Sequence, residues 1–118
     1  MTYVQIGENK FPAFVAGRVM DRDWDNRASK YITVEMSYED ALKVFVDDIE
    51  WSIVCEMEEP IEQVDAEGNV VYITEDIYDN SEYSIAGDIV DHRNGTITAK
   101  MGKPTAEELL AIIEEGLN

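Results

Sequence analysis

The clearest strand of this sequence is the stretch Ile49-Glu50-Trp51-Ser52-Ile53-Val54-Cys55-Glu56-Met57-Glu58. Apolar residues occupy its odd positions, and the positions between them are mostly acidic or polar. This period of two is typical of a strand with one buried and one solvated face. A slip by one residue would turn the acidic side chains into the core, so we expect the register of this strand to be strongly specified.

Seven more stretches have strand patterns, at residues 2–6, 10–20, 31–36, 61–64, 70–74, 83–91 and 96–101. Most of the links between them are short enough for hairpins, which favours antiparallel pairing. The link at Asn94-Gly95 is the strongest such signal, because both residues tolerate the positive φ of a type I′ turn. The segment Asp21–Ser29 has no strand pattern and is interpreted as a polar loop.

Two short helices are predicted. Ser37 is a candidate N-cap for a helix at about 38–46, and Thr105 with Glu108 forms a capping box before a second helix at about 106–115. Leu109, Ile112 and Ile113 give this second helix an apolar stripe that we expect to pack on the sheet. The predicted fold is therefore α+β, a mainly antiparallel sheet of about eight strands with two packed helices, in a single domain covering residues 1–118.

The negative charge of the chain is concentrated in one segment. The formal net charge is −17, and the 49 residues between Lys43 and Arg93 hold fifteen Asp and Glu but no Lys or Arg. Nine Lys and Arg against 26 Asp and Glu argue against direct binding of nucleic acid or of an anionic membrane. The same charge favours a basic protein partner, divalent cations, or solvation alone.

A hairpin at about 58–78, with Asp65–Asn69 as its loop, is the most acidic part of this segment and is expected to project from the domain. The candidate partner-binding residues are its acids and a tryptophan in the polar loop: Trp24, Glu58, Glu59, Glu62, Glu67, Glu75 and Asp76. Tryptophan is enriched in binding hot spots, although a loop tryptophan more often folds back onto its own core.

Three alternate carboxylates, Asp21, Asp23 and Asp25, have the spacing that begins a calcium loop. The positions where an EF-hand requires Gly and Glu hold Asn26 and Ile32, so the motif is incomplete. Two interpretations stay open. These residues bind calcium, or they belong to a solvated loop with local ion pairs to Arg22 and Arg27. No other cofactor is expected.

The sequence carries no nucleotide-binding, metalloprotease or hydrolase motif. His92 is the one histidine, next to a predicted turn, and Cys55 is the one cysteine, on the apolar side of a strand. A catalytic histidine needs a nucleophile or metal beside it, and the pattern brings none. We therefore expect a protein that is not an enzyme.

Two pairs of segments together resemble small proteins encoded by phages and prophages of Gram-positive bacteria, in the late region near tail genes. The segments are 23–30 with 46–53, and 79–83 with 87–96. The resemblance covers most of the chain outside residues 58–78. It implies no active site, and it implies a role associated with the virion or with tail assembly.

The leading hypothesis is a non-enzymatic phage or prophage accessory protein that presents an acidic surface to a basic protein partner. One alternative is an acidic mimic of nucleic acid that inhibits a host protein, and another is a divalent-cation-binding module.

Residues 1–20 lack the continuous apolar core of a signal peptide, and no apolar run reaches the roughly 20 residues of a membrane helix. The expected location is the bacterial cytoplasm when the protein is made, with later association with the virion, and self-association stays open.

Overall fold

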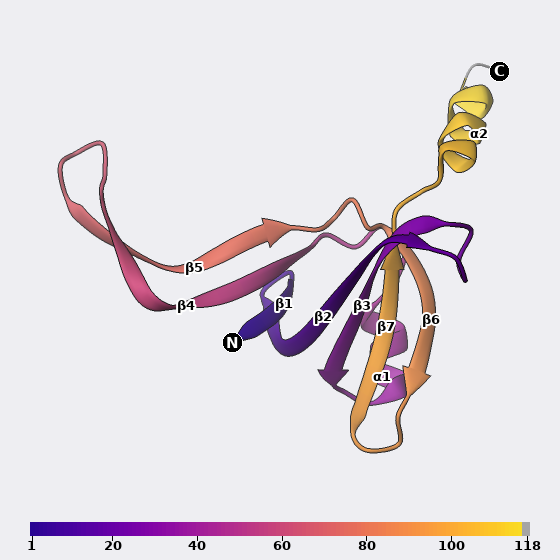
Figure 1. Ribbon diagram of the computed structural model, residues 1–118, viewed down its shortest axis with the longest axis horizontal. Helices are drawn as coiled ribbons and strands as arrows, with labels where there is room; N and C mark the ends of the chain where they lie inside the picture. The colour runs from indigo at the N-terminus through magenta and orange to yellow at the C-terminus, as the bar shows by residue number, and fades with distance from the viewer. Residues whose placement is uncertain (117–118) are drawn as a thin grey trace.

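The computed structural model describes residues 1–116, and its main feature is one antiparallel sheet of seven strands in the order β5-β4-β1-β2-β3-β7-β6 (Figure 1). The strands are β1 (Thr2–Ile6), β2 (Asn9–Asp21), β3 (Arg27–Glu35), β4 (Trp51–Val64), β5 (Val70–Asp79), β6 (Ile85–Asp91) and β7 (Thr96–Gly102). The helices are α1 (Tyr38–Val44) and α2 (Ala106–Gly116). The predicted α+β fold with an antiparallel sheet and two short helices is confirmed.

The sheet has one strand fewer than expected, because the predicted strands at 49–57 and 61–64 are both part of β4. Glu56 pairs with Glu75 and Ile61 pairs with Ile73, so four residues of β4 lie opposite one residue of β5. This bulge contains Pro60, which has no N–H to donate to a neighbouring strand. The proline therefore bends the strand without ending it.

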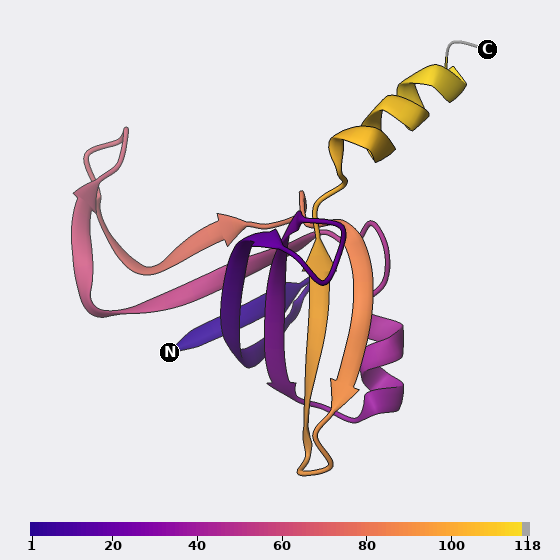
Figure 2. The same cartoon turned by 45° about the vertical axis from the view of Figure 1, so that its right-hand side comes forward.

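The core lies between α1 and the concave side of the curved sheet (Figure 2). Trp51 is buried there, and its indole N–H donates to the carbonyl oxygen of Tyr83 at 3.1 Å. The other buried apolar residues of this cluster are Val4, Ile32, Val34, Ala41, Phe45, Ile97, Ala99 and Met101. Helix α1 begins as predicted, with the Ser37 hydroxyl accepting from the Asp40 N–H at 3.1 Å.

The alternation expected along β4 holds only in part. Trp51 faces the core, but Val54 is also fully buried and lies on the opposite face, paired with Tyr3 on β1 and Ile77 on β5. Cys55 is only half-buried. Burial of Trp51 and Val54 shows that both faces of β4 are covered near its start.

The expected packing of the second helix on the sheet is wrong. Helix α2 points away from the sheet (Figures 1 and 2), and the side chains of its apolar stripe, Leu109, Leu110, Ile112 and Ile113, are 49–63% exposed. The link Lys103–Thr105 directs the helix outward, and Glu108 holds its first turn against Arg27. No helix in the described part of the chain has the length and apolar character to cross a lipid bilayer.

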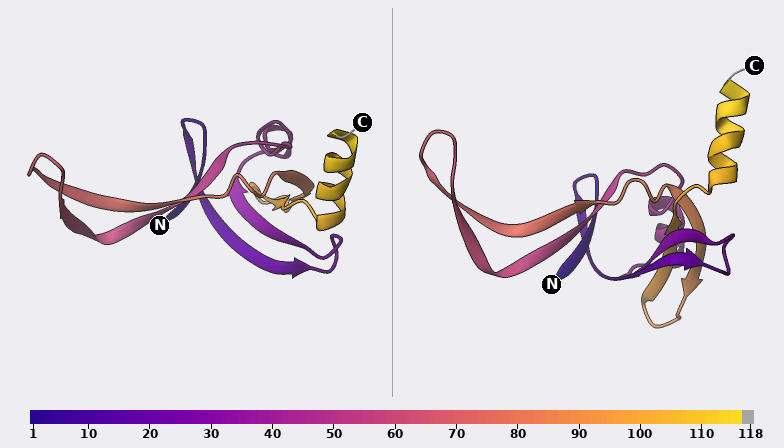
Figure 3. Two further views of the ribbon diagram at one scale, coloured as in Figure 1. Left: turned by 90° about the horizontal axis from the view of Figure 1, so that it is seen from above. Right: turned by 45° about the horizontal axis from the view of Figure 1, so that its top comes forward.

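The outer half of the β4–β5 hairpin extends away from the rest of the sheet as a bent ribbon (Figures 1 and 3). The radius of gyration is 17.3 Å, against about 13.5 Å for a compact domain of this length. The molecule therefore has two projecting elements, this hairpin and α2, on a small curved body.

Candidate functional site: the acidic arm and the groove at its base

The arm is defined here as residues 57–75, the part of the β4–β5 hairpin beyond the support of β1. Pairing between β1 and β4 ends at Cys55, followed by one bond from the Glu56 N–H to the Met1 carbonyl oxygen at 3.0 Å. Among the described residues, no third strand pairs with the arm. A two-stranded hairpin alone is only marginally stable in water, so the arm gains little from its own contacts.

Both faces of the outer arm carry exposed apolar side chains. Cross-strand partners share a face, so Ile61, Gln63, Val71 and Ile73 lie on one face, while Glu62, Val64, Val70 and Tyr72 lie on the other. Val64 and Tyr72 are 69% and 63% exposed. A hairpin that packed on its own domain would bury one face and solvate the other, whereas the arm leaves apolar side chains exposed on both faces.

Six carboxylates surround these apolar pairs, with no Lys or Arg among residues 57–75. The predicted partner residues Glu58, Glu59, Glu62 and Glu67 lie on the arm and are exposed, and Asp76 is exposed at its base. Glu75 differs because it is half-buried and forms an ion pair with Lys10 of β2. The hydrogen bond that Lys10 donates to the Glu75 carboxylate raises the pKa of Lys10, so this lysine stays charged and fixes the base of the arm.

The loop of the arm is ordered by its own aspartate. The Asp65 carboxylate accepts from the backbone N–H groups of Asn69 at 2.8 Å and Glu67 at 2.9 Å. These bonds, that from Asn69 foremost, lower the pKa of Asp65. The arm tip is therefore a defined turn that carries a permanent negative charge at neutral pH.

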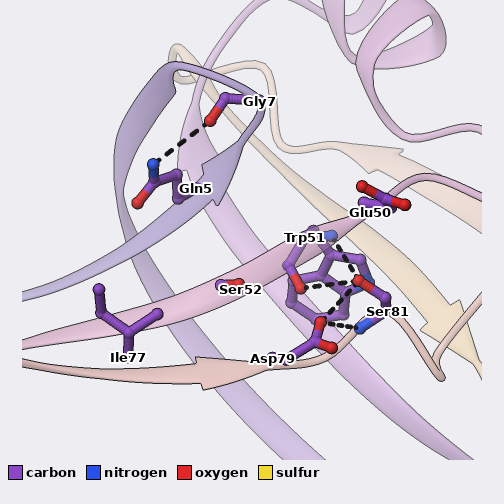
Figure 4. Close-up of a pocket in the computed structure, with 8 residues that line it drawn as sticks. All are labelled: Gln5, Gly7, Glu50, Trp51, Ser52, Ile77, Asp79 and Ser81. Carbon is purple, nitrogen blue, oxygen red and sulfur yellow. Dashed lines mark hydrogen bonds between the residues drawn. The ribbon is translucent and has the colours of Figure 1, made fainter.

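A groove of about 560 Å³ lies at the base of the arm (Figure 4). The lining residues Gln5, Ser52 and Asp79 form a row across β1, β4 and β5, and Glu50 and Ser81 also line the groove. The Ser81 hydroxyl donates to the Asp79 carboxylate at 2.6 Å, and this bond is the main cause that lowers the pKa of Asp79. The charged residues that line the groove are both carboxylates, so it suits a cationic side chain.

The three aspartates predicted as calcium ligands are not brought together. Asp21 is fully buried and accepts from the Ser29 hydroxyl at 3.0 Å, from the Tyr31 hydroxyl, and from the Asp23 N–H at 3.1 Å. The side chains of Asp23 and Asp25 are exposed and form ion pairs with Arg18 and Arg27, at 4.0 and 3.4 Å. Within residues 1–116, no group of three or more His, Cys, Asp or Glu is placed to hold a metal ion.

Trp24 is half-buried on the body of the domain, away from the arm. A Cβ built on Gly87 would lie 2.8 Å from the Trp24 ring, and one on Gly102 would also lie 2.8 Å from it. The guanidinium of Arg27 lies 4.8 Å from the ring centroid. Trp24 thus covers one glycine of β6 and one of β7. This contact agrees with the interpretation in which the loop tryptophan packs on its own domain.

Sequence reasoning missed the buried polar cluster beside Trp24. Asp21, Arg27 and Ser29 are buried, although the segment that contains them was predicted to be a polar loop. The desolvated Asp21 carboxylate has a lowered pKa, chiefly because the Tyr31 hydroxyl donates to it. The only signal in the sequence was the recurrence of polar residues at alternate positions in 27–31, which resembles an exposed strand.

His92 and Cys55 lie in separate settings. His92 is exposed, and its Nε2 atom lies 2.7 Å from the Thr98 hydroxyl. Cys55 is half-buried in β4, paired with Thr2 and Asp76. The geometry gives neither side chain a role in a catalytic pair.

No protein-family model, curated protein or solved structure matches the chain. The resemblance to phage and prophage proteins therefore stays a prediction from sequence.

Proposed function

We propose that this chain is a non-enzymatic binding protein that presents its acidic arm to a basic protein partner. The biological setting we propose is that of a phage or prophage accessory protein in tail or virion assembly, which rests on the sequence resemblance alone. In this proposal, apolar pairs on both faces of the arm enter a cleft of the partner, and the surrounding carboxylates meet Lys and Arg at the rim of that cleft.

The observation that carries the proposal is the exposure of apolar side chains on both faces of a hairpin that the domain does not cover. The domain leaves Val64, Val70 and Tyr72 exposed, and they would favour aggregation unless something covers or separates them. The flanking carboxylates keep copies of the arm apart by repulsion. They also steer a basic partner toward the arm, because complementary charges accelerate association.

The arrangement on the arm favours a protein partner over mimicry of nucleic acid. A mimic needs rows of negative charge that replace phosphates. The face formed by Ile61, Gln63, Val71 and Ile73 has no carboxylate among these four paired positions. An apolar face of this kind fits the buried centre of a protein interface, where charged residues are depleted.

The test is capture of a partner from phage-producing bacterial cells by the tagged chain and by variants of the arm. The apolar variant is Val64→Thr with Val70→Thr, which keeps side-chain shape and β-propensity but adds hydroxyls. The charge variant is Glu58→Gln, Glu59→Gln and Glu62→Gln. We expect the unmodified chain to retain a basic protein, and both variants to lose most of it.

Matched controls make this test specific to the arm. Val19→Thr changes an apolar residue of β2 that is 94% exposed, and Glu8→Gln with Glu35→Gln and Glu107→Gln removes three exposed charges elsewhere. These controls should retain the partner. Equal capture by the arm variants would overturn the proposal, and displacement of the captured protein by DNA or RNA would favour the nucleic-acid mimic instead.

A further inference from the structure

A second groove, separate from the arm, runs between helix α1 and the edge strand β6. Its volume is about 580 Å³. Tyr38, Leu42 and Val46 of the α1 region form one wall, and Ala86 and Ile89 of β6 form the other. Leu42 and Val46 are 50% and 41% exposed, so the helix wall presents apolar surface to the solvent.

The strand wall of this groove is a free sheet edge. β6 is the last strand of the sheet, paired with β7 on one side only. The chain already uses the first part of this edge, because the Asp48 N–H donates to the Ser84 carbonyl oxygen at 2.7 Å and the Ala86 N–H donates to the Asp47 carboxylate at 2.8 Å. Beyond Ala86, residues 87–91 have no strand on their outer side in the described part of the chain.

The charge at the groove selects the kind of peptide that fits it. Its lining includes the carboxylates of Asp47 and Asp88 and no Lys or Arg. Asp91, at the end of β6, is also exposed. A peptide with basic residues would therefore meet complementary charge, while a second copy of this acidic chain would be repelled.

We infer that the groove between α1 and β6 binds an extended basic peptide, which adds as a strand to the edge of β6. Backbone hydrogen bonds to residues 87–91 supply affinity, as in other cases of strand addition at a sheet edge. Alternate apolar side chains of the peptide pack on Leu42 and Val46, and its Lys or Arg side chains reach Asp47 and Asp88. This inference is independent of the arm, so either proposal can fail while the other holds.

The probe for the test is a capped six-residue peptide of alternating Lys and Val, titrated into the ¹⁵N,¹³C-labelled full chain and followed by NMR. A peptide of this size is expected to bind with a Kd on the order of 0.1–1 mM. The expected shift changes are at the amides of residues 87–91 and at the methyl groups of Leu42 and Val46. A peptide of alternating Glu and Val should cause none of them.

Two changes separate strand addition from simple charge attraction. Replacing the central Val of the peptide by Pro removes a backbone donor and should weaken binding roughly three- to tenfold. Asp88→Asn in the protein should weaken binding roughly two- to fivefold, while Glu8→Gln, which removes one exposed charge from the turn between β1 and β2, should change it less than twofold.

Three outcomes would overturn the inference. The first is the absence of shift changes at residues 87–91 at several millimolar peptide. The second is equal binding of the proline-containing peptide, which would leave charge attraction as the cause. The third is a pattern of shifts centred on residues 57–75, which would place the peptide on the arm.

Discussion

The Glu108 carboxylate joins helix α2 to the sheet by accepting a hydrogen bond from the guanidinium of Arg27 at 2.8 Å. The same carboxylate oxygen accepts from the Thr105 N–H at 2.8 Å, so one side chain both caps the helix and anchors it. Arg27 is buried, and its guanidinium also donates to the Lys103 carbonyl oxygen at 3.1 Å. The direction of α2 is therefore fixed at its first turn, which explains why the helix projects although it has an apolar stripe.

Glu108→Ala should loosen α2 without unfolding the sheet. The helix loses its capping box, and we expect the free energy of its local opening to fall by about 1 kcal/mol. Amide hydrogen exchange at residues 109–114 measures this directly. Glu107→Ala is the matched control, because Glu107 is in the same turn and makes neither contact. Equal exchange in the two variants would contradict the anchoring role of Glu108.

The anchor should also weaken in acid. The Thr105 N–H first, and Arg27 second, lower the pKa of Glu108 below its ordinary value. Since the folded pKa is lowered, the stabilisation is complete above the unfolded value of about 4.3 and is lost as the pH falls through the folded value. An NMR titration of the Glu108 side chain should give a midpoint below 4.3, and a midpoint above that value would be inconsistent with these contacts.

Asp21→Asn should destabilise the whole domain. The buried carboxylate accepts from Ser29, Tyr31 and the Asp23 N–H, and an amide cannot accept all of these bonds. We expect the free energy of unfolding in urea to fall by about 1–3 kcal/mol. Asp23→Asn, at a side chain that is 83% exposed, should change it by less than about 0.5 kcal/mol. Similar effects of the two substitutions would show that the buried Asp21 carboxylate contributes no more to the free energy of unfolding than an exposed aspartate does.

Gly87→Ala should destabilise the contact between Trp24 and β6. The added Cβ would lie 2.8 Å from the Trp24 ring and 3.0 Å from the Lys100 Cβ, so the indole has to move. The expected cost is about 1–3 kcal/mol in urea denaturation, with a change in Trp24 fluorescence. Gly17→Ala is the control, because the added group meets only the flexible side chain of Lys30. A neutral Gly87→Ala would mean that Trp24 does not pack there.

Millimolar Ca²⁺ should leave the melting temperature unchanged. Asp21 is occupied by protein donors, and Asp23 and Asp25 point to separate arginines. A ligand that binds only the folded state must raise the midpoint of unfolding. A rise that disappears in Asp23→Asn would restore the cation-binding hypothesis.

Local signals predicted most of the elements correctly. Ser37 and Thr105 mark the first turns of the two helices, and Gly7, with φ of 61°, lies in the two-residue turn of the first hairpin. The hairpin at Asn94-Gly95 is also in its predicted place. However, the residues of this turn that have positive φ are Arg93 and Gly95, and a type I′ turn at Asn94-Gly95 requires positive φ at Asn94 as well. The expected type I′ turn is therefore wrong. The pairing of β6 with β7 makes this turn one residue longer than the predicted two-residue turn. Turn preferences of single residues do not show this pairing.

The errors come from interactions between distant residues. Nothing near Leu109 or Ile112 in the sequence reveals that Arg27, some 80 positions earlier, holds α2 away from the sheet. The buried cluster of Asp21, Ser29 and Arg27 was interpreted as a loop because polar residues are usually exposed, and only tertiary partners allow their burial. In contrast, the acidic arm could be located from sequence, because it depends on composition and on one hairpin signal.

The most direct test of the central claim is the salt dependence of association between this chain and the protein that its arm captures. Stopped-flow measurements from 50 to 500 mM salt should show an association rate that falls steeply, because screening removes electrostatic steering. The Glu58→Gln, Glu59→Gln and Glu62→Gln variant should associate more slowly at low salt and depend less on salt. A rate that does not change with salt, or a variant as fast as the unmodified chain, would contradict the account.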